Sequence, residues 1–159
     1  MTIKFQLDSS YKQKILINRK DASEDIRSEE CGTNASIIAK YERIRNDMIS
    51  FQRSFLKKPG LIADGRDMGT VVFSDSKIKI FLTADVDVRA KRRYKELKEK
   101  GINVSLAAVL SDMKIRDKQD KERKHGPLTM AHDSILVDST NKSIDIVVSE
   151  ILKYYENMY

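Results

Sequence analysis

The spacing of apolar residues changes several times along the chain, and each spacing predicts a different element. Residues 3–8 and 14–19 alternate apolar with polar positions, as half-buried strands do. The turn-forming sequence DSSYKQ separates them, so these segments predict a small antiparallel unit. From Asn34 to Leu56 apolar residues recur every three to four positions, which predicts helix, and Pro59-Gly60 ends that run.

The C-terminal hundred residues alternate short apolar runs with helical patterns. Residues 61–64, 77–84 and 135–140 are short and apolar, and we expect them to be strands. Residues 86–101 predict a helix with Asp85 as N-cap and Gly101 as its stop. Ser105 caps a further predicted helix, and an amphipathic helix closes the chain. This order predicts an α/β domain with parallel strands, preceded by an α+β insert.

Composition narrows the class of protein without naming a function. The chain has 159 residues, of which 40% are hydrophobic and 34% charged, as expected for one globular domain with a small insert. No apolar run is long enough to span a membrane, and a single cysteine excludes an internal disulfide framework. We therefore expect a cytoplasmic protein. Its formal net charge of +6 favours anionic ligands, which include nucleotide phosphates, nucleic acid and acidic partners.

The first candidate site is the sequence DGRD at residues 64–67, directly after the apolar run 61–64. Ligands of open parallel sheets bind at the carboxyl ends of the strands, which is where this sequence falls. The guanidinium of Arg66 is a fork for phosphate, and the carboxylate of Asp67 accepts hydrogen bonds from an amine or hydroxyl. An arginine–aspartate pair that merely ends the strand is an equally good interpretation of this spacing.

The second candidate site is the charged segment 114–128, which ends at Gly126-Pro127. Its cations repel one another unless they are solvated or face an anion, so it is either a solvated helix end or a phosphate-closing lid. A phosphate-binding loop of the form G-x-x-x-x-G-K-[ST] is not found. The nearest match, residues 60–67, has Arg66-Asp67 where lysine and a hydroxyl residue are required, and its first glycine precedes the predicted strand.

Several stretches together resemble the bacterial cytidylate kinases, which phosphorylate CMP and dCMP at the expense of ATP. They are EDIRSEE (24–30), NASIIAKYERIR (34–45), PGLIADGRDMGTVVF (59–73), IKIFLTA (78–84), RAKRRYKELKEKG (89–101), IRDKQDKER (115–123) and LVDST (136–140). The resemblance implies the parallel sheet of P-loop nucleoside monophosphate kinases with a CMP-binding insert and a lid. It divides the chain into 1–58, the insert and following helix, and 59–159, part of the kinase core with its lid at about 114–128.

The resemblance also implies roles for individual residues. Asp67, Arg45 and Arg123 match family positions that contact CMP, with Asp67 accepting from the cytosine amine. Ser36, Arg116 and Asp120 match positions around the nucleotide. The cations implied to neutralise phosphate charge during catalysis are Arg66, Arg116, Lys118 and Lys121. Two lid positions carry lysine where the family often has arginine, which removes bidentate geometry.

The chain departs from the family pattern at its beginning. Family members start with a strand, a Walker A loop, a helix and a second strand, whereas this sequence starts at the first strand of the insert. We therefore expect an incomplete sheet, without its first two strands. ATP and Mg²⁺ are expected for the family, but this sequence holds a binding motif for neither and no metal site. In the strand order 2-3-1-4-5, the absent first strand belongs between residues 61–65 and 77–82.

Three interpretations of function follow from this departure. The leading one is a (d)CMP kinase chain that is inactive or severely impaired by itself, and that pairs with a separate N-terminal P-loop piece or a second copy of itself. A second is a non-catalytic nucleotide-binding protein or gene remnant. A third, a basic nucleic-acid-binding module, is less well supported because the aromatic residues mostly fall on helical core positions.

Overall fold

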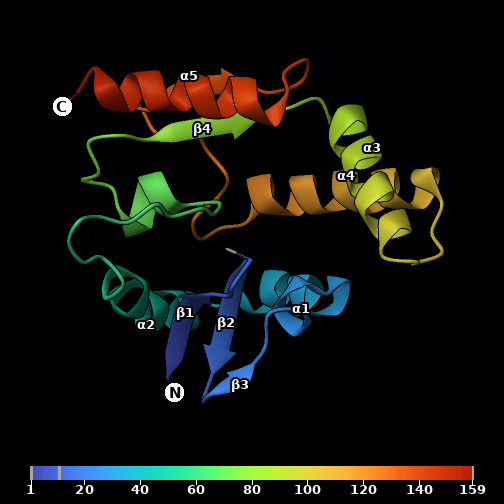
Figure 1. Ribbon diagram of the computed structural model, residues 1–159, viewed down its shortest axis with the longest axis horizontal. Helices are drawn as coiled ribbons and strands as arrows, with labels where there is room; N and C mark the ends of the chain where they lie inside the picture. Colours follow the sequence, from blue (N-terminus) through green and yellow to red (C-terminus); the bar gives the residue numbers. More distant parts are fainter. Residues whose placement is uncertain (1, 11, 159) are drawn as a thin grey trace. The chain divides into compact units, whose positions relative to one another are not determined.

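The computed structural model describes residues 2–10 and 12–158 (Figure 1). They divide into two compact units, Met1–Asn46 and Asp47–Tyr159. The first unit is an α+β arrangement, and the second carries a parallel sheet with helices. Residues 11 and 159, which fall in the predicted first turn and the predicted closing helix, lie outside the described residues.

The first unit begins with a three-stranded antiparallel sheet in the order β1-β2-β3. Its strands are β1 (Ile3–Leu7), β2 (Gln13–Ile17) and β3 (Lys20–Asp21). The register pairs Ile3 with Ile17 and Phe5 with Ile15, so apolar residues share one face. The predicted antiparallel unit is thus confirmed. Asp8 shapes the turn between β1 and β2, because its carboxylate accepts from the backbone N–H of Ser10 and of Lys12.

The predicted helical run from Asn34 to Leu56 is two helices rather than one. A 3₁₀ turn, η1 (Asp25–Arg27), leads into α1 (Glu29–Ile38), and α2 (Glu42–Arg53) follows after a short break. Backbone N–H groups of Lys40 and Tyr41 donate to the last carbonyls of α1, which closes that helix. Residues 39–41 are Ala, Lys and Tyr, none of which is a helix breaker, so the sequence carries no signal for this break.

The second unit contains a two-stranded parallel sheet formed by β4 (Ile80–Thr83) and β5 (Ile135–Asp138). Phe81 lies opposite Leu136, and Leu82 opposite Val137. Val137 is fully buried, as expected for a strand of a parallel sheet. The predicted parallel α/β arrangement is confirmed in this coarse form, with strands shorter than the apolar runs that predicted them.

Residues 61–64 are the clearest error of the sequence-based prediction, because they form no strand. All four are exposed, and Ile62 is completely so. A short apolar run becomes a strand only where a neighbour accepts and donates its backbone hydrogen bonds, and among the described strands none pairs with it. Residues 60–67 differ from a Walker A loop in having Arg66 and Asp67 where lysine and a hydroxyl residue are required. The position of Gly60 gives no further reason, since no described strand directly follows it.

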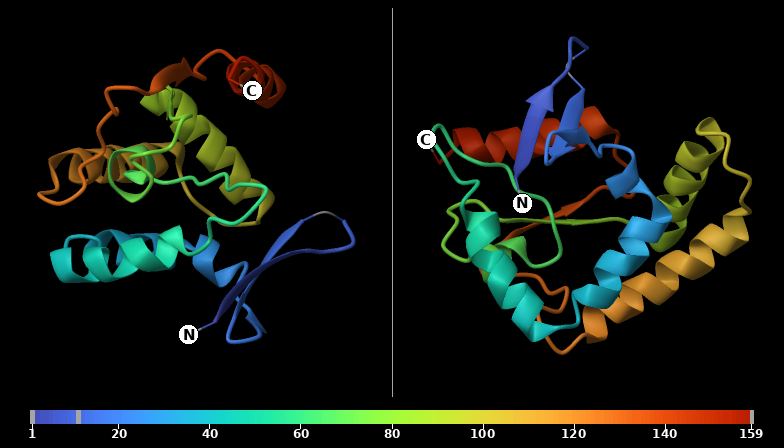
Figure 2. Two further views of the ribbon diagram at one scale, coloured as in Figure 1. Left: turned by 90° about the vertical axis from the view of Figure 1, so that its left-hand side faces the viewer. Right: turned by 90° about the horizontal axis from the view of Figure 1, so that it is seen from below.

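Three helices complete the second unit: α3 (Val86–Glu99), α4 (Leu106–Glu122) and α5 (Ile144–Glu156). The predicted caps are confirmed, because Asp85 accepts from the N–H of Asp87 and Ser105 from that of Ala108. Gly101 ends α3 at a φ of +75°, a left-handed conformation that glycine adopts without strain. In two further views, α3 and α4 form a pair joined by the short connection at 100–105 (Figure 2).

The principal apolar core lies between α3 and α4. Ala90 and Leu97 of α3 and Val109 of α4 are buried together. Half-buried side chains pack against them: Val104, Leu110 and Met113. This contact fixes the N-terminal half of α4 against α3 and thereby determines where the charged second half of α4 begins.

Candidate functional site

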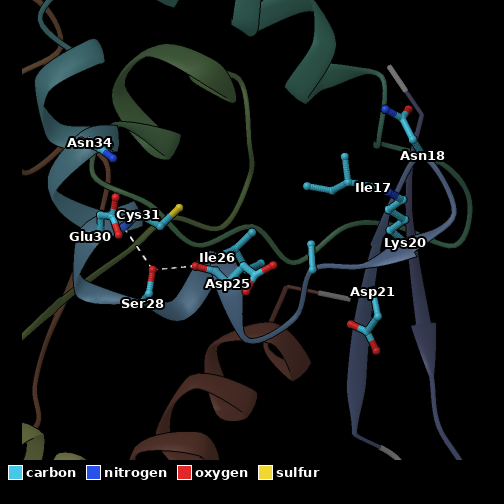
Figure 3. A pocket seen from close by; sticks show the side chains of 11 residues that line it. Ile17, Asn18, Lys20, Asp21, Asp25, Ile26, Ser28, Glu30, Cys31 and Asn34 are labelled. Carbon is cyan, nitrogen blue, oxygen red and sulfur yellow. Dashed lines mark hydrogen bonds between the residues drawn. The ribbon is translucent and has the colours of Figure 1, made fainter. Parts of the chain in front are cut away.

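The first unit contains an open cavity of about 780 Å³ beside the start of α1 (Figure 3). Its lining mixes acidic side chains with Lys20 and Cys31. Ser28 organises one wall, because its hydroxyl accepts from the N–H of Cys31 at 3.1 Å and donates to the carbonyl of Asp25 at 2.7 Å. None of the predicted site residues lines this cavity, so the predicted chemistry must be sought elsewhere.

Two predicted site residues belong to this first unit. Ser36 lies in α1 and is half-buried. Arg45 lies in α2, and its guanidinium donates to the carbonyl oxygen of Ala39 at 3.4 Å. This bond holds Arg45 against the break between the two helices.

The other predicted residues belong to the second unit, and three of them form one cluster. Arg66 Nε donates to Asp120 Oδ2 at 2.8 Å, and Arg123 lies 3.8 Å from the other oxygen of the same carboxylate. Asp120 is buried, with a side chain 7% exposed. The side chain of Arg123 is 9% exposed, whereas that of Arg66 is 43% exposed. A buried carboxylate next to two guanidinium groups can orient both.

The loop after α4 completes this cluster from its own backbone. Arg123 Nε donates to the carbonyl of Gly126, and the N–H of Leu128 donates to the carbonyl of Asp120 at 2.7 Å. Gly126 has a φ of +57°, which glycine accommodates without strain. The end of the predicted lid is therefore folded back onto the last turn of α4.

Asp67 lies next to Arg66 in sequence but is buried, with 8% of its surface exposed. It begins η2 (Met68–Val72), a single π-helical turn, and its carbonyl accepts from the N–H groups of Val71 and Val72. Arg53 caps the other end of η2 by donating to the carbonyls of Val72 at 2.5 Å and Val71 at 3.2 Å. Within DGRD, Asp67 is thus directed inward and Asp64 and Arg66 are exposed. The turn that follows is held at both ends.

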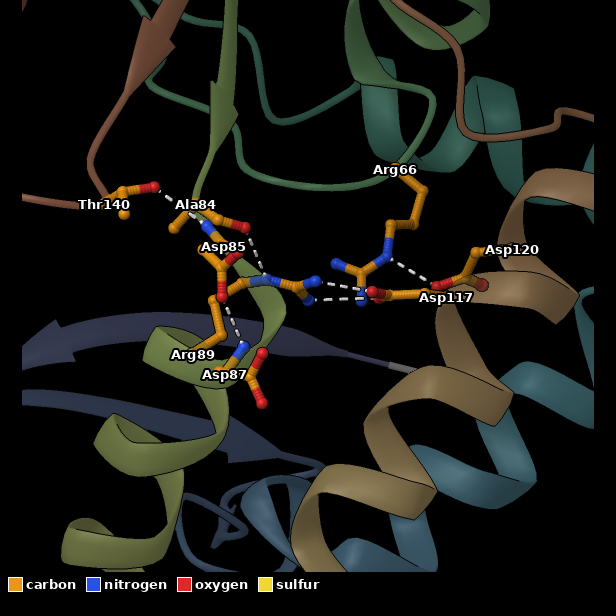
Figure 4. A network of polar contacts seen from close by, with 8 residues as sticks. All are labelled: Arg66, Ala84, Asp85, Asp87, Arg89, Asp117, Asp120 and Thr140. Atoms are coloured by element: carbon orange, nitrogen blue, oxygen red, sulfur yellow. Dashed lines mark hydrogen bonds and ion pairs between the residues drawn. The ribbon is translucent and has the colours of Figure 1, made fainter.

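A second ion pair, which sequence reasoning missed, lies one helical turn before Asp120 (Figure 4). Arg89 of α3 binds Asp117 of α4 with both ends of its fork, at 3.1 Å and 2.5 Å. Its Nε donates to the carbonyl of Ala84, immediately after β4, at 3.0 Å. The hydrogen bond to Asp117 raises the pKa of Arg89 above its ordinary value. Many cations lie along α3, and nothing in the sequence singles out Arg89 among them, so only the fold reveals this pair.

The carboxyl ends of β4 and β5 are joined by side chains of the sequence DST at 138–140. Ser139 Oγ donates to the carbonyl of Thr83 at 3.1 Å, and Thr140 Oγ1 accepts from the N–H of Asp85 at 2.9 Å. Hydrogen bonds from Thr140 lower the pKa of Asp138. Arg92 of α3 donates to the carbonyl of Ser139 at 2.6 Å. The edge at which parallel sheets bind ligands is therefore rigidly built.

The remaining predicted cations lie on the exposed surface of α4. They are Arg116, Lys118 and Lys121. Together with Arg66 they give this part of the unit positive charge that is available to an anion, beside carboxylates that accept hydrogen bonds. Among the described residues, no group of three or more His, Cys, Asp or Glu side chains is placed to hold a metal ion. No described helix is both long and apolar enough to cross a membrane.

Comparison with known proteins gives a consistent result. The family model described as cytidylate kinase matches residues 1–157. A cytidylate kinase of Aeromonas salmonicida is 46% identical over 98% of this chain and 67% of its own length. A cytidylate kinase of Nitrosomonas europaea is 47% identical over 89% of this chain and 63% of its own length. A cytidylate kinase of Pseudomonas aeruginosa is 46% identical over 94% of this chain and 65% of its own length. The chain thus spans about two thirds of the length of these relatives.

Proposed function

The chain belongs to the cytidylate kinase family, and from this premise we propose that it carries the acceptor side of a (d)CMP kinase. The reaction is transfer of the terminal phosphoryl group of ATP to CMP or dCMP, giving CDP or dCDP. The observation that carries the proposal is the cluster of Arg66, Asp120 and Arg123 beside the buried Asp67. It places carboxylate acceptors and guanidinium donors together, which is what recognition of a cytosine nucleotide requires.

The base and sugar are assigned to six polar residues, of which Asp67 and Asp120 are buried. Cytosine offers an amine that donates and two atoms, N3 and O2, that accept. Asp67 is the acceptor for the amine, and Arg45 and Arg123 are donors. Ser36, Arg116 and Asp120 surround the rest of the nucleotide, including its sugar hydroxyls.

The phosphate groups are assigned to the exposed cations. Arg66, Arg116, Lys118 and Lys121 neutralise charge that develops during transfer, which is the main contribution of protein to phosphoryl transfer. Arg66 gives up or shares its bond with Asp120 when a phosphate arrives, since its side chain is 43% exposed. Segment 114–128 acts as the lid that brings these cations onto the phosphates.

The donor side is proposed to come from polypeptide beyond these 159 residues. ATP and Mg²⁺ are expected for the family, and Mg²⁺ would neutralise phosphate charge when bound. The described residues include no suitable set of metal ligands, so they do not fit a resident Mg²⁺ by themselves. We propose that a separate N-terminal piece supplies this side with its P-loop. A second copy of the chain is the other proposed partner, and it would pair exposed strands without supplying a P-loop.

Exposed apolar surface in the second unit supports this view of an incomplete sheet. Leu82 of β4 and Leu136 of β5 are each more than half exposed, and none of the described strands pairs with residues 61–64. Parallel strands are ordinarily covered on both faces and paired on both edges. A further strand between residues 61–65 and β4 would satisfy these requirements.

Calorimetric titration with CMP and with UMP tests the acceptor site. UMP has a carbonyl where CMP has an amine, so a carboxylate acceptor favours CMP. We expect the unmodified chain to bind CMP in preference to UMP, and Asp67→Asn to weaken CMP binding by about tenfold or more. Asp67→Asn preserves the shape of a buried side chain, and its circular dichroism controls for misfolding.

Two results would contradict the proposal. The first is failure of the folded chain to bind CMP, which would favour a gene remnant without nucleotide binding. The second is an unchanged affinity and preference in the Asp67→Asn protein, which would remove Asp67 from the site.

A further inference from the structure

The guanidinium of Arg89 is committed to protein groups on all three of its nitrogens. Nε donates to the carbonyl of Ala84, and the two terminal nitrogens donate to the two oxygens of Asp117. The Arg89 and Asp117 side chains are 32% and 26% exposed, so this pair is only partly screened by water. Arg89 is thus an anchor that connects the end of β4 to the middle of α4.

The second half of α4 is held by ion pairs, because the apolar packing of this helix against α3 ends at Met113. The core between α3 and α4 includes Val109, Leu110 and Met113, and no described residue of α4 beyond Met113 belongs to it. Ile115, the next apolar residue, is 54% exposed. The ion pairs of Asp117 and Asp120 therefore hold the segment that carries the lid cations (Figure 4).

Helical geometry determines how these ties orient the cations. Each residue advances by about 100° around an α-helix, so Arg116 lies about 40° from Asp120 and Lys121 about 40° from Asp117. The two carboxylates thus lie between Arg116 and Lys121 on one arc of α4. Because the two cations flank the carboxylates, rotation of the helix about its axis would bring one cation toward the side that Arg66 approaches and carry the other away, so a single ligand can meet both only in one orientation of α4.

The ion pairs Arg66–Asp120 and Arg89–Asp117 differ in how readily they can break. Arg66 is 43% exposed and is itself assigned to phosphate, so its bond to Asp120 is exchangeable. Arg89 has its fork and its Nε in use and remains bound when Arg66 moves. Of the two arginines, only Arg89 is therefore suited to keep α4 oriented throughout a binding cycle.

We propose that Arg89 is a positioning residue: by holding Asp117 it fixes the rotation of α4, so that Arg116 and Lys121 face the phosphate of the bound nucleotide. The effect of Arg89 on nucleotide binding rests on the proposed function. Its effect on the orientation of α4 does not rest on that function, so the positioning role and the proposed function can be tested separately.

Hydrogen exchange of the ligand-free chain tests the orientation. We expect Arg89→Gln and Asp117→Asn to speed exchange of the backbone N–H groups at 114–122 by about tenfold, while those at 106–112 change less because the apolar core holds them. Lys95→Gln is the matched control. It removes an exposed cation of α3 whose partner, Glu99, is 3.9 Å away on the same helix. Unchanged exchange in both variants would overturn the proposal.

Calorimetry with CMP and with cytidine then tests whether the orientation of α4 strengthens binding of the nucleotide's phosphate. Cytidine lacks the phosphate, so the ratio of the two affinities isolates the phosphate contribution. We expect each variant to lower this ratio by about fivefold to tenfold, and the double variant to lower it no further, because the residues act through one another. General destabilisation would weaken both ligands alike and leave the ratio unchanged.

The outcomes separate the two ideas. One outcome is that the unmodified chain binds CMP while the variants show the same ratio of CMP affinity to cytidine affinity. In that case Arg89 has a structural role only, and the positioning proposal is wrong. If the unmodified chain does not bind CMP, the proposed function fails, and the claim about phosphate fails with it.

Discussion

Gly101 shows how one backbone angle ends a helix, and it gives the first prediction. Its φ is +75°, and a Cβ added there would meet no atom within 4 Å. The cost of Gly101→Ala is therefore conformational rather than steric, and we expect a loss of about 1 kcal/mol in the free energy of unfolding by urea. Asn tolerates this conformation better, so Gly101→Asn should cost less.

Gly60→Ala is the matched control for this prediction. Its position is equally open, but its φ is not in the left-handed region. Replacement there should be neutral or slightly stabilising. Equal losses at Gly60 and Gly101 would contradict the argument from φ.

The pair of Lys79 and Asp133 predicts a dependence of stability on pH. Lys79 is buried, and its ammonium donates to Asp133 and to the carbonyl of Ser74, both at 2.6 Å. The bond from Lys79 lowers the pKa of Asp133 below its ordinary value of 3.8. A lowered carboxyl pKa contributes stability above pH 3.8, which is lost as the pH falls through the folded-state pKa.

We expect Asp133→Asn to lower the thermal midpoint at pH 7, and the difference from the unmodified chain to shrink below about pH 4. Asp75→Asn, an exposed residue of the loop after η2, is the control and should change little. A difference that stays constant from pH 7 to pH 3 would show that the ion pair is not its source.

The residue-level features that the sequence predicted correctly are local ones. Asp85 and Ser105 accept hydrogen bonds from N–H groups two and three residues away. Gly101 ends its helix through its own positive φ. Arg89 and Arg92 bind partners 28 and 47 residues away, so their roles depend on the tertiary fold. In a helix of many cations, nothing local distinguishes these two arginines from their solvated neighbours.

At the scale of elements, the contact between α3 and α4 makes a quantitative prediction. Leu97 is 5% exposed and lies in the cluster with Ala90 and Val109. Leu97→Ala would leave a cavity there, and we expect a loss of about 2–4 kcal/mol in unfolding free energy by urea. Because α4 rests on this contact, exchange at 106–122 should rise with it.

Leu152→Ala serves as the control, since Leu152 is of the same type but half exposed on α5. Its replacement should cost well under half as much. If both variants lost equal stability, the α3–α4 cluster would not be the principal core of this unit.

Helices were predicted better than strands, for a physical reason. The bonds of α3 and α4 are internal to each helix, so spacing and caps suffice to define them. A strand needs a neighbour, and 61–64 and 80–83 are similar apolar runs with different outcomes. The second pairs with β5, whereas the first has no partner among the described strands. Apolar composition alone does not determine which run finds a partner.

At the scale of the whole molecule, the exposed surface is large for the mass. A folded chain of 18.3 kDa is expected to expose about 8,100 Å², and about 9,600 Å² if the two units are counted as separate proteins. The chain exposes 12148 Å². Its excess includes Ile62, Leu82 and Leu136, with Ile144 and Val148 of α5. The segment proposed to complete the kinase would cover apolar surface of this kind.

The excess of exposed surface leads to the last prediction, which concerns both kinase activity and the surface buried on folding. By itself the chain should show no robust CMP-dependent release of ADP from ATP, for lack of a P-loop among these residues. Fusion to the remaining third of the Aeromonas salmonicida relative should bring such release. The fused protein should also show a steeper dependence of unfolding on urea than the added residues alone explain, because surface of this chain becomes buried. Robust turnover by the chain alone would contradict the need for a donor segment, and turnover without the steeper dependence would place that segment elsewhere than on the exposed sheet.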